Sequence, residues 1–130
     1  MSFESDVLAF KKDTEKGLEK SVRATYLQAY AAIIRMTPVD TGRARSNWFA
    51  GLNRVPTVTT KGTRRTVANT RTAKNTAKRF KLGNSISLVN NLPYIVALED
   101  GHSKQARGGM VKVVFSRLER ILYNKIKALK

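Results

Sequence analysis

Apolar and small residues recur at steps of three and four over the first third of the chain, which is the spacing of one α-helical face. This stripe comprises Phe3, Val7, Phe10, Thr14, Leu18, Val22, Thr25, Ala29, Ile33 and Met36. Acidic Glu4 and Asp6 suit the positive end of a helix dipole. Pro38 forces Thr37 out of helical geometry. The pattern therefore predicts a helix over residues 4–36.

The predicted first helix is too long for a chain of this size. At 1.5 Å per residue it would extend about 50 Å. A compact domain of 130 residues is only about 28 Å across. We therefore expect the helix either to bend near Gly17, its one weak point, or to project and pack on another subunit.

Two short strands and a capped turn are predicted in the middle of the chain. Asp40 or Thr41 can cap a short helix whose first turn contains Gly42 and Arg43. A tight turn here would need a positive φ at Gly42. Residues 47–52 predict a strand with Trp48, Ala50 and Leu52 on one face. Alternation over residues 85–90 predicts a second strand with Ile86 and Leu88 inward, and a turn at Asn91–Pro93 follows.

Between these strands lies a basic segment at about 53–81. Residues 53–66 are rich in Thr, Arg, Gly and Pro, which is typical of a mobile loop or a long hairpin arm; valines leave room for weak strands. Residues 69–81 predict a short helix with Ala73, Ala77 and Phe80 on one side. The opposite side is cationic.

The last third of the chain predicts a second amphipathic helix. The apolar element over residues 94–99 is compatible with either strand or helix. A glycine-bounded loop covers residues 100–109, and an apolar stripe then predicts a helix over about 110–129. That stripe comprises Val111, Val114, Phe115, Leu118, Ile121, Leu122, Ile126 and Leu129.

Together these elements predict one α+β domain over residues 1–130, with a long N-terminal helix and a C-terminal helix packed on a small, mostly antiparallel sheet. Most aromatic side chains are expected in the core, and Tyr26 and Tyr30 are expected on a second contact face of the first helix. The residues expected to pack the first helix on the sheet are Val7, Phe10, Leu18, Val22 and Ile33.

Composition narrows the possible functions. The chain has no cysteine, which excludes disulfides, thiol nucleophiles and cysteine-ligated metals. The longest apolar run, Ala29–Ile34, is far shorter than the roughly 20 residues of a membrane span. The first residues are acidic and polar, unlike a secretory signal. We expect a soluble basic protein that works inside a cell.

The net charge of +16 is unevenly distributed, because residues 41–98 carry eleven basic residues and no acidic one. Such a segment favours an anionic partner, either nucleic acid or an acidic protein surface. A basic surface retained only for solubility is the simpler alternative. The residues expected to contact DNA or an acidic partner are Arg64, Arg65, Arg71, Lys74, Lys78, Arg79 and Lys81.

No catalytic set stands out, and no cofactor or metal is expected. His102 is the only histidine, which excludes a two-histidine metal site. A two-metal nuclease needs several converging carboxylates, and only Asp40, Glu99 and Asp100 are candidates. We expect these carboxylates instead to cap helices and to pair with arginines, and we predict no enzymatic activity.

Two segments resemble a known family. Residues 37–48 (TPVDTGRARSNW) are similar to one signature of the neck, or tail-completion, proteins of tailed bacteriophages. Residues 90–94 (NNLPY), 98–106 (LEDGHSKQA) and 109–111 (GMV) resemble the second signature of that family, in the same order. The chain departs from the pattern at Ala44, Asp100 and Arg107, and residues 53–81 match poorly.

The resemblance implies a structural virion protein at the head–tail junction, made in the host cytoplasm. It implies a hexameric or dodecameric ring around the DNA channel, with other neck, portal-side and tail-tube proteins as partners and non-specific contact with packaged DNA. The alternative from charge alone is a free-standing nucleic-acid-binding protein. The residues assigned to signature turns or interfaces are Asp40, Thr41, Gly42, Arg43, Asn91, Pro93, Tyr94, Glu99, Gly101, His102, Lys104, Gln105 and Gly109.

Overall fold

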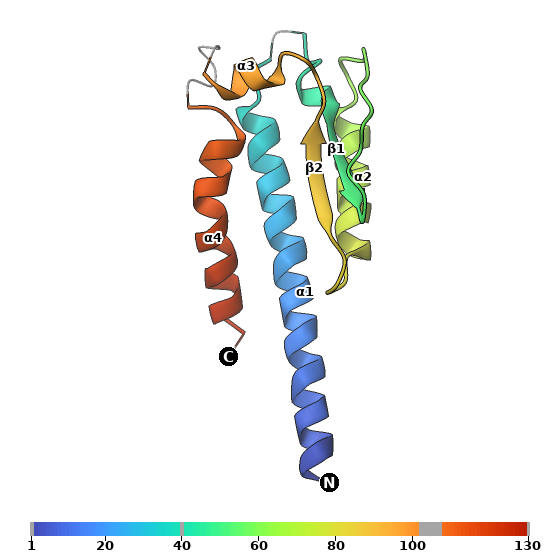
Figure 1. Cartoon of the computed structure of the whole chain (residues 1–130), viewed down its shortest axis with the longest axis vertical. Helices are drawn as coiled ribbons and strands as arrows, with labels where there is room; N and C mark the ends of the chain where they lie inside the picture. The colour runs from blue at the N-terminus through green and yellow to red at the C-terminus, as the bar shows by residue number, and fades with distance from the viewer. Residues whose placement is uncertain (1, 40, 102–107, 130) are drawn as a thin grey trace.

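The computed structural model describes residues 2–39, 41–101 and 108–129, and it has an α+β architecture (Figure 1). The elements in chain order are α1 (Phe3–Met36), the 3-10 helix η1 (Arg45–Asn47), β1 (Trp48–Leu52), α2 (Thr66–Arg79), β2 (Ile86–Asn90), α3 (Ile95–Glu99) and α4 (Val111–Lys127). The predicted fold class is confirmed. None of the helices in the described ranges is both long and apolar enough to cross a lipid bilayer.

The long helix α1 projects beyond everything that packs on it (Figure 1). Ser2 caps its start by accepting a hydrogen bond from the backbone N–H of Ser5 at 3.2 Å. The helix continues through Gly17 without a break, and residues 2–16 are all exposed. Of the two alternatives for this helix, a bend or a projection, the structure therefore has the projection.

The exposed stretch of α1 corrects part of the expected core. Val7 and Phe10 were expected on the sheet, but they are 47% and 73% exposed. Leu18 and Val22 are half-buried, and only Ile33 is buried. A helical stripe marks the face that avoids water, but it does not reveal how far along the helix a partner extends.

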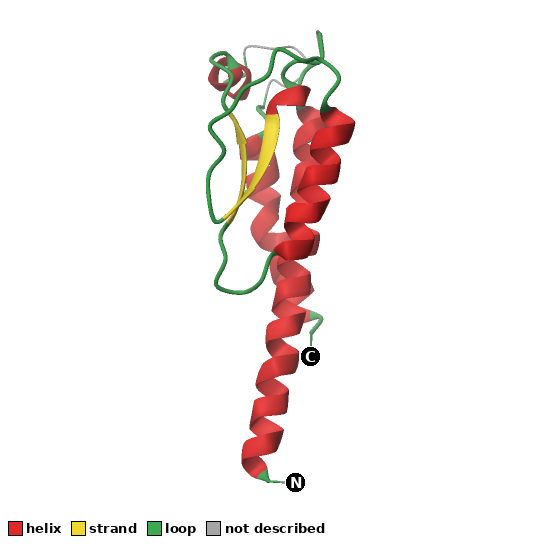
Figure 2. Cartoon of the chain, turned by 90° about the vertical axis from the view of Figure 1, so that its right-hand side faces the viewer, coloured by secondary structure: helices red, strands yellow, loops and turns green. Residues whose placement is uncertain are grey.

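The two strands form an antiparallel ladder that runs from the Trp48–Asn90 pair to the Leu52–Ile86 pair. Because alternate residues share a face, Trp48, Ala50 and Leu88 point together into the helical core. Helices α1, α2 and α4 lie on one side of the strands in Figure 2, whereas the short helix α3 lies beyond their upper end. A side chain at Gly51 would collide with the Arg54 carbonyl oxygen, only 2.3 Å from the ideal Cβ position, so the following loop packs closely there.

The basic segment divides into a loop over residues 53–65 and helix α2, which begins three residues earlier than predicted. Val67 lies in this helix and not in a strand. The loop is pinned to the body: the Asn91 side-chain amide donates to the carbonyls of Pro56 at 3.0 Å and Val58 at 3.1 Å. Ala73 and Ala77 are buried as expected, and so is Phe80 directly after the helix.

The C-terminal third contains two helices, which settles the ambiguous residues 94–99 as α3. Helix α4 lies alongside α1, yet only Val114 of its apolar stripe is fully buried. Phe115 is 61% exposed and Tyr123 is 65% exposed. Together with Phe3 and Phe10, these side chains show that the expectation of mostly buried aromatics is wrong, although Tyr30, Trp48 and Phe80 are buried.

A buried polar chain joins the end of α1 to the start of β1. The Trp48 indole N–H donates to the Thr37 hydroxyl at 2.9 Å, and that hydroxyl donates to the Ile33 carbonyl at 2.6 Å. Trp48 packs there against Tyr30, Ile34 and Met110 in the core cluster. The Thr37 hydroxyl thus satisfies the hydrogen-bonding requirement of the buried indole N–H.

Replacing this hydroxyl tests the junction. Thr37→Val keeps the shape but leaves the Trp48 N–H without an acceptor, so we expect a loss of about 1–3 kcal/mol in the free energy of unfolding. Urea denaturation measures it. The control Thr37→Ser retains the oxygen and is expected to lose much less; equal losses in both variants would contradict a role for the hydroxyl.

Candidate functional site

The two segments that resemble neck-protein signatures meet at one end of the molecule (the upper end in Figure 1), although more than forty residues separate them along the chain. The Asn90 side-chain amide donates to the Ala44 carbonyl at 3.0 Å. Trp48, Asn91, Glu99 and Met110 line a shared, mainly apolar hollow of about 460 Å³. We call this region, residues 37–48 and 90–111 as far as they are described, the junction end.

Gly42 builds the first turn of the junction end. Its φ is +91°, and an added Cβ would lie 2.5 Å from the Thr63 carbonyl oxygen. The positive φ expected for a tight turn is therefore confirmed. Thr41 accepts a hydrogen bond from the Arg43 backbone N–H at 3.3 Å, and a turn leads into η1. A short 3-10 helix replaces the short capped helix of the prediction.

Two arginines of the first segment join separate backbone segments through hydrogen bonds. The Arg45 guanidinium donates to the carbonyls of Thr37 at 2.9 Å and Arg35 at 3.1 Å. The Arg43 Nε donates to the Thr60 carbonyl at 3.3 Å, and the buried Asn47 side chain both donates to and accepts from the Thr60 backbone. Arg43 and Asn47 therefore hold the loop over residues 53–65 against the turn, and Arg45 ties the turn to the end of α1.

Glu99 closes the junction end by capping α4. Its carboxylate accepts hydrogen bonds from the backbone N–H groups of Met110 and Lys112 at 2.9 Å and of Val111 at 2.8 Å. Burial acts to raise its pKa, but the three N–H donors and the Lys112 ammonium outweigh burial and hold the pKa below its usual range. The expectation that this carboxylate caps a helix is confirmed.

Two glycines after Glu99 shape the connection to α4. Gly101 ends α3 with a φ of +87°, and Gly109 has the same value. A Cβ on Gly109 would lie 2.5 Å from the Glu99 carbonyl oxygen. Pro93 and Tyr94 are exposed between β2 and α3. Four assigned residues lie outside the described residues, namely Asp40, His102, Lys104 and Gln105.

The second candidate surface is the cationic side of α2, which we call the basic face. All seven residues expected to contact an anion are exposed on this helix and its two flanks. Within the part of the chain that the structure describes, the only ion pair is Arg23 with Glu19. The helix of 14 residues extends about 21 Å, or roughly six base pairs of DNA. Arg71 and Lys74 border a shallow hollow of about 320 Å³.

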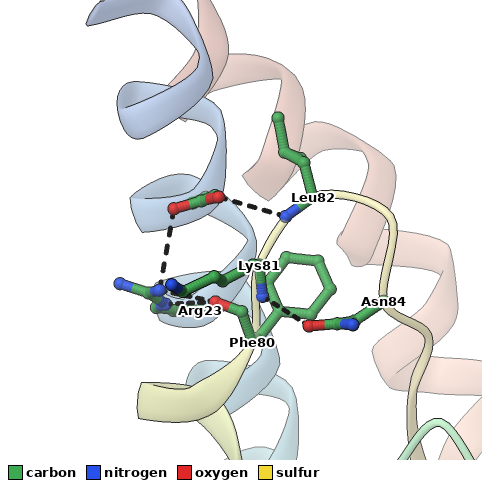
Figure 3. Close-up of polar contacts among 6 residues, drawn as sticks. Arg23, Phe80, Lys81, Leu82 and Asn84 are labelled. Carbon is green, nitrogen blue, oxygen red and sulfur yellow. Dashed lines mark hydrogen bonds and ion pairs between the residues drawn. The ribbon is translucent and has the colours of Figure 1, made fainter. Parts of the chain in front are cut away.

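A polar clamp on α1 fixes the end of the basic face (Figure 3). The Arg23 guanidinium donates through Nε to the Phe80 carbonyl at 3.0 Å, and through Nη2 to the same oxygen. Glu19 accepts from the Leu82 backbone N–H at 3.1 Å and pairs with Arg23 at 3.7 Å. The sequence analysis did not predict this clamp, although the i, i+4 spacing of Glu19 and Arg23 is typical of an ion pair on a helix.

Two tyrosines hold α1 against β2 and α2, which agrees with the expected second contact face of this helix. The Tyr26 hydroxyl donates to the Ser87 carbonyl at 2.7 Å, and the Tyr30 hydroxyl shares a hydrogen bond with Thr70 at 3.2 Å. Burial, and then the neighbouring Tyr30, raise the pKa of Tyr26 well above its usual value. Burial likewise raises the pKa of Tyr30. Both phenols are therefore neutral hydrogen-bonding groups at neutral pH.

The carboxylates of the junction end do not form a metal-binding cluster among the residues that the structure describes. Glu99 is half-buried, and its carboxylate already accepts hydrogen bonds from three backbone N–H groups. Comparison of the chain with protein families, with curated proteins and with solved structures finds no match.

Gly42 offers a sharp test of the junction end. Gly42→Ala combines a positive φ with a collision against the Thr63 carbonyl, whereas Gly83 has a φ of +96° and open space around it. We expect Gly83→Ala to cost about 1–2 kcal/mol from φ alone and Gly42→Ala to cost clearly more. Thermal or urea unfolding compares them; equal costs would show that the contact with Thr63 is unimportant.

Glu99 gives a pH-dependent test. Glu99→Ala is expected to lower the free energy of unfolding by roughly 0.5–2 kcal/mol near neutral pH, and Asp100→Ala serves as the neighbouring control. Since the folded-state pKa is lowered, the stabilisation is fully present above the unfolded value of about 4.3 and is lost as pH falls through the folded value. The difference between wild type and Glu99→Ala should therefore shrink in acid. A difference that stays constant from pH 7 to pH 2 would contradict the capping role.

Proposed function

We propose that this chain is a non-enzymatic structural subunit of the neck of a tailed bacteriophage, which joins head and tail as one member of a hexameric or dodecameric ring around the DNA channel. The observation that carries the proposal is the junction end. Two segments that resemble separate family signatures fold onto each other, and their residues interlock through Asn90 with Ala44 and through the hollow shared by Trp48 and Met110.

The distribution of apolar side chains supports a subunit that assembles. Phe3 at 82% exposure and Phe10 at 73% lie on the projecting part of α1, and Phe115 and Tyr123 lie exposed on α4. Single exposed apolar residues are common, but a row on one helix and a second row on its neighbour mark an interaction surface. A ring subunit buries such surface on the adjacent subunits.

The basic face supports a position next to packaged DNA or an acidic neighbour. Its seven cations have no carboxylate partner among the described residues, so an external anion has to balance them. Lysines and arginines of this kind attract phosphates without reading bases. This same observation favours the alternative function, a free-standing protein that binds nucleic acid.

The two functions differ in where the protein is found. We expect the purified particles of the phage that encodes this chain to contain it at a fixed multiple of about six copies, as measured by quantitative mass spectrometry and by electron cryomicroscopy of the neck. A free-standing binder would be absent from particles and would retard short duplex DNA as a monomer, with an affinity that falls steeply as salt rises.

Reversal of the basic face tests its contribution. We expect the variant with Lys74→Glu, Lys78→Glu and Lys81→Glu to fold, because all three side chains are exposed. Because its charge is reversed at the basic face, we expect it to fail in head–tail joining or in DNA retention. The control replaces the same lysines by arginine, which preserves the charge. Infectivity is measured by complementation; wild-type titres with the glutamate variant would exclude the basic face from the mechanism.

A further inference from the structure

The projecting part of α1, residues 3–16, is exposed along its whole length, and the outer part of its apolar face has no partner among the described residues. We call it the arm. Helix α4 covers α1 only as far as a hollow of about 510 Å³ lined by Leu18, Ile126 and Leu129, with Phe10 at its outer side. Beyond that point Phe3 and Val7 continue the stripe uncovered. The stripe therefore extends past the last described residue that covers it.

The outer end of the arm is acidic. Glu4 and Asp6 precede the first basic residue, Lys11, so the first two turns have a net charge of −2. By contrast, residues 41–98 contain no acidic residue. The tip of the arm thus combines exposed phenylalanine and valine side chains with negative charge, on a molecule that is otherwise strongly positive.

A groove of matching character lies at the far end of the same helix pair. It has a volume of about 400 Å³ between α1 and α4, and its floor includes Ala29, Ala32 and Val114. Small side chains let a helix approach closely. Arg35 and Arg117 line the groove, are exposed, and have no carboxylate partner among the described residues.

We propose that the arm of one copy lies in this groove of a second copy, with its apolar stripe on the alanines and with Glu4 and Asp6 facing Arg35 and Arg117. The charges are complementary, and both surfaces are apolar at their centres. A single chain cannot make this contact itself. Residues 7 and 32 belong to one continuous helix and lie about 38 Å apart along it.

The contact has a direction, because the arm and the groove are different surfaces. Each copy would offer its arm to the next, and such a head-to-tail contact propagates until it closes as a ring. This inference rests on the proposed function, since it names the partner within the proposed ring as a second copy of this chain. DNA is a poor partner for the arm, because its phosphates repel Glu4 and Asp6.

A charge swap between full-length variants tests the contact. The arm variant carries Glu4→Lys and Asp6→Lys, and the groove variant carries Arg35→Glu and Arg117→Glu. Each alone places like charges together, so we expect the dissociation constant of self-assembly to rise at least tenfold in analytical ultracentrifugation. An equimolar mixture restores opposite charges at every contact and should assemble at a one-to-one ratio. Combining all four changes in one chain should restore self-assembly.

The control variant carries Arg54→Glu and Lys61→Glu, two exposed residues outside the arm, the groove and the basic face, and it should leave assembly unchanged. A second readout uses the absence of native cysteine. A chain with Val7→Cys and Ala32→Cys should form intermolecular links with a short bis-maleimide reagent, and one with Val7→Cys and Lys78→Cys should not.

The outcomes separate this inference from the proposed function. A wild-type chain that stays monomeric, an arm variant that assembles normally, or an arm that binds only another neck protein would overturn the arm-in-groove contact while leaving incorporation into particles possible. Self-assembly through the swap pattern in a protein that never enters particles would support the contact and overturn the proposed function.

Discussion

The length of α1 relative to the elements that cover it is the constraint from which the rest of the molecule follows. A helix of 34 residues extends about 51 Å, but the sheet, α2 and α4 cover only its C-terminal half. A helix segment gains little stability from itself in water and depends on packing of its apolar face. The exposed arm therefore lacks the packing on its apolar face that stabilises a helix. Its exposure accounts for the wrongly predicted burial of Val7 and Phe10.

The covered half of α1 is held by polar contacts as much as by the small core. Tyr26 reaches β2, Arg23 and Glu19 grip the chain after α2, and Thr37 accepts the indole N–H of Trp48. Each contact joins segments that are far apart in the chain or in different layers. These contacts hold α2, and with it the basic face, in a defined position on α1, although the sheet has only two strands among the described residues.

The junction end shows how turn chemistry and helix capping can create one region from two distant segments. Gly42 permits the close approach of residue 63, Asn91 binds the loop from the other side, and Glu99 starts α4 through three backbone N–H groups. The arginines of this region, Arg43 and Arg45, donate hydrogen bonds to backbone carbonyls. The cations left for an external anion are consequently those of α2, which is where the acid-free composition had indicated them.

The sequence alone determined α1, α4 and the two strands, because helical and strand periodicities are local and strong. It also indicated the positive φ of Gly42 and the capping role of Glu99, since a tight turn needs glycine and a helix start attracts a carboxylate. Only the tertiary structure decided whether α1 bends or projects, which of its apolar residues are covered, and whether residues 94–99 are helical. These depend on where other segments end in space, and periodicity along one segment carries no information about that. The clamp at Arg23 and the groove beside Arg117 became visible for the same reason, because each is made by helices and loops that meet only in the folded chain.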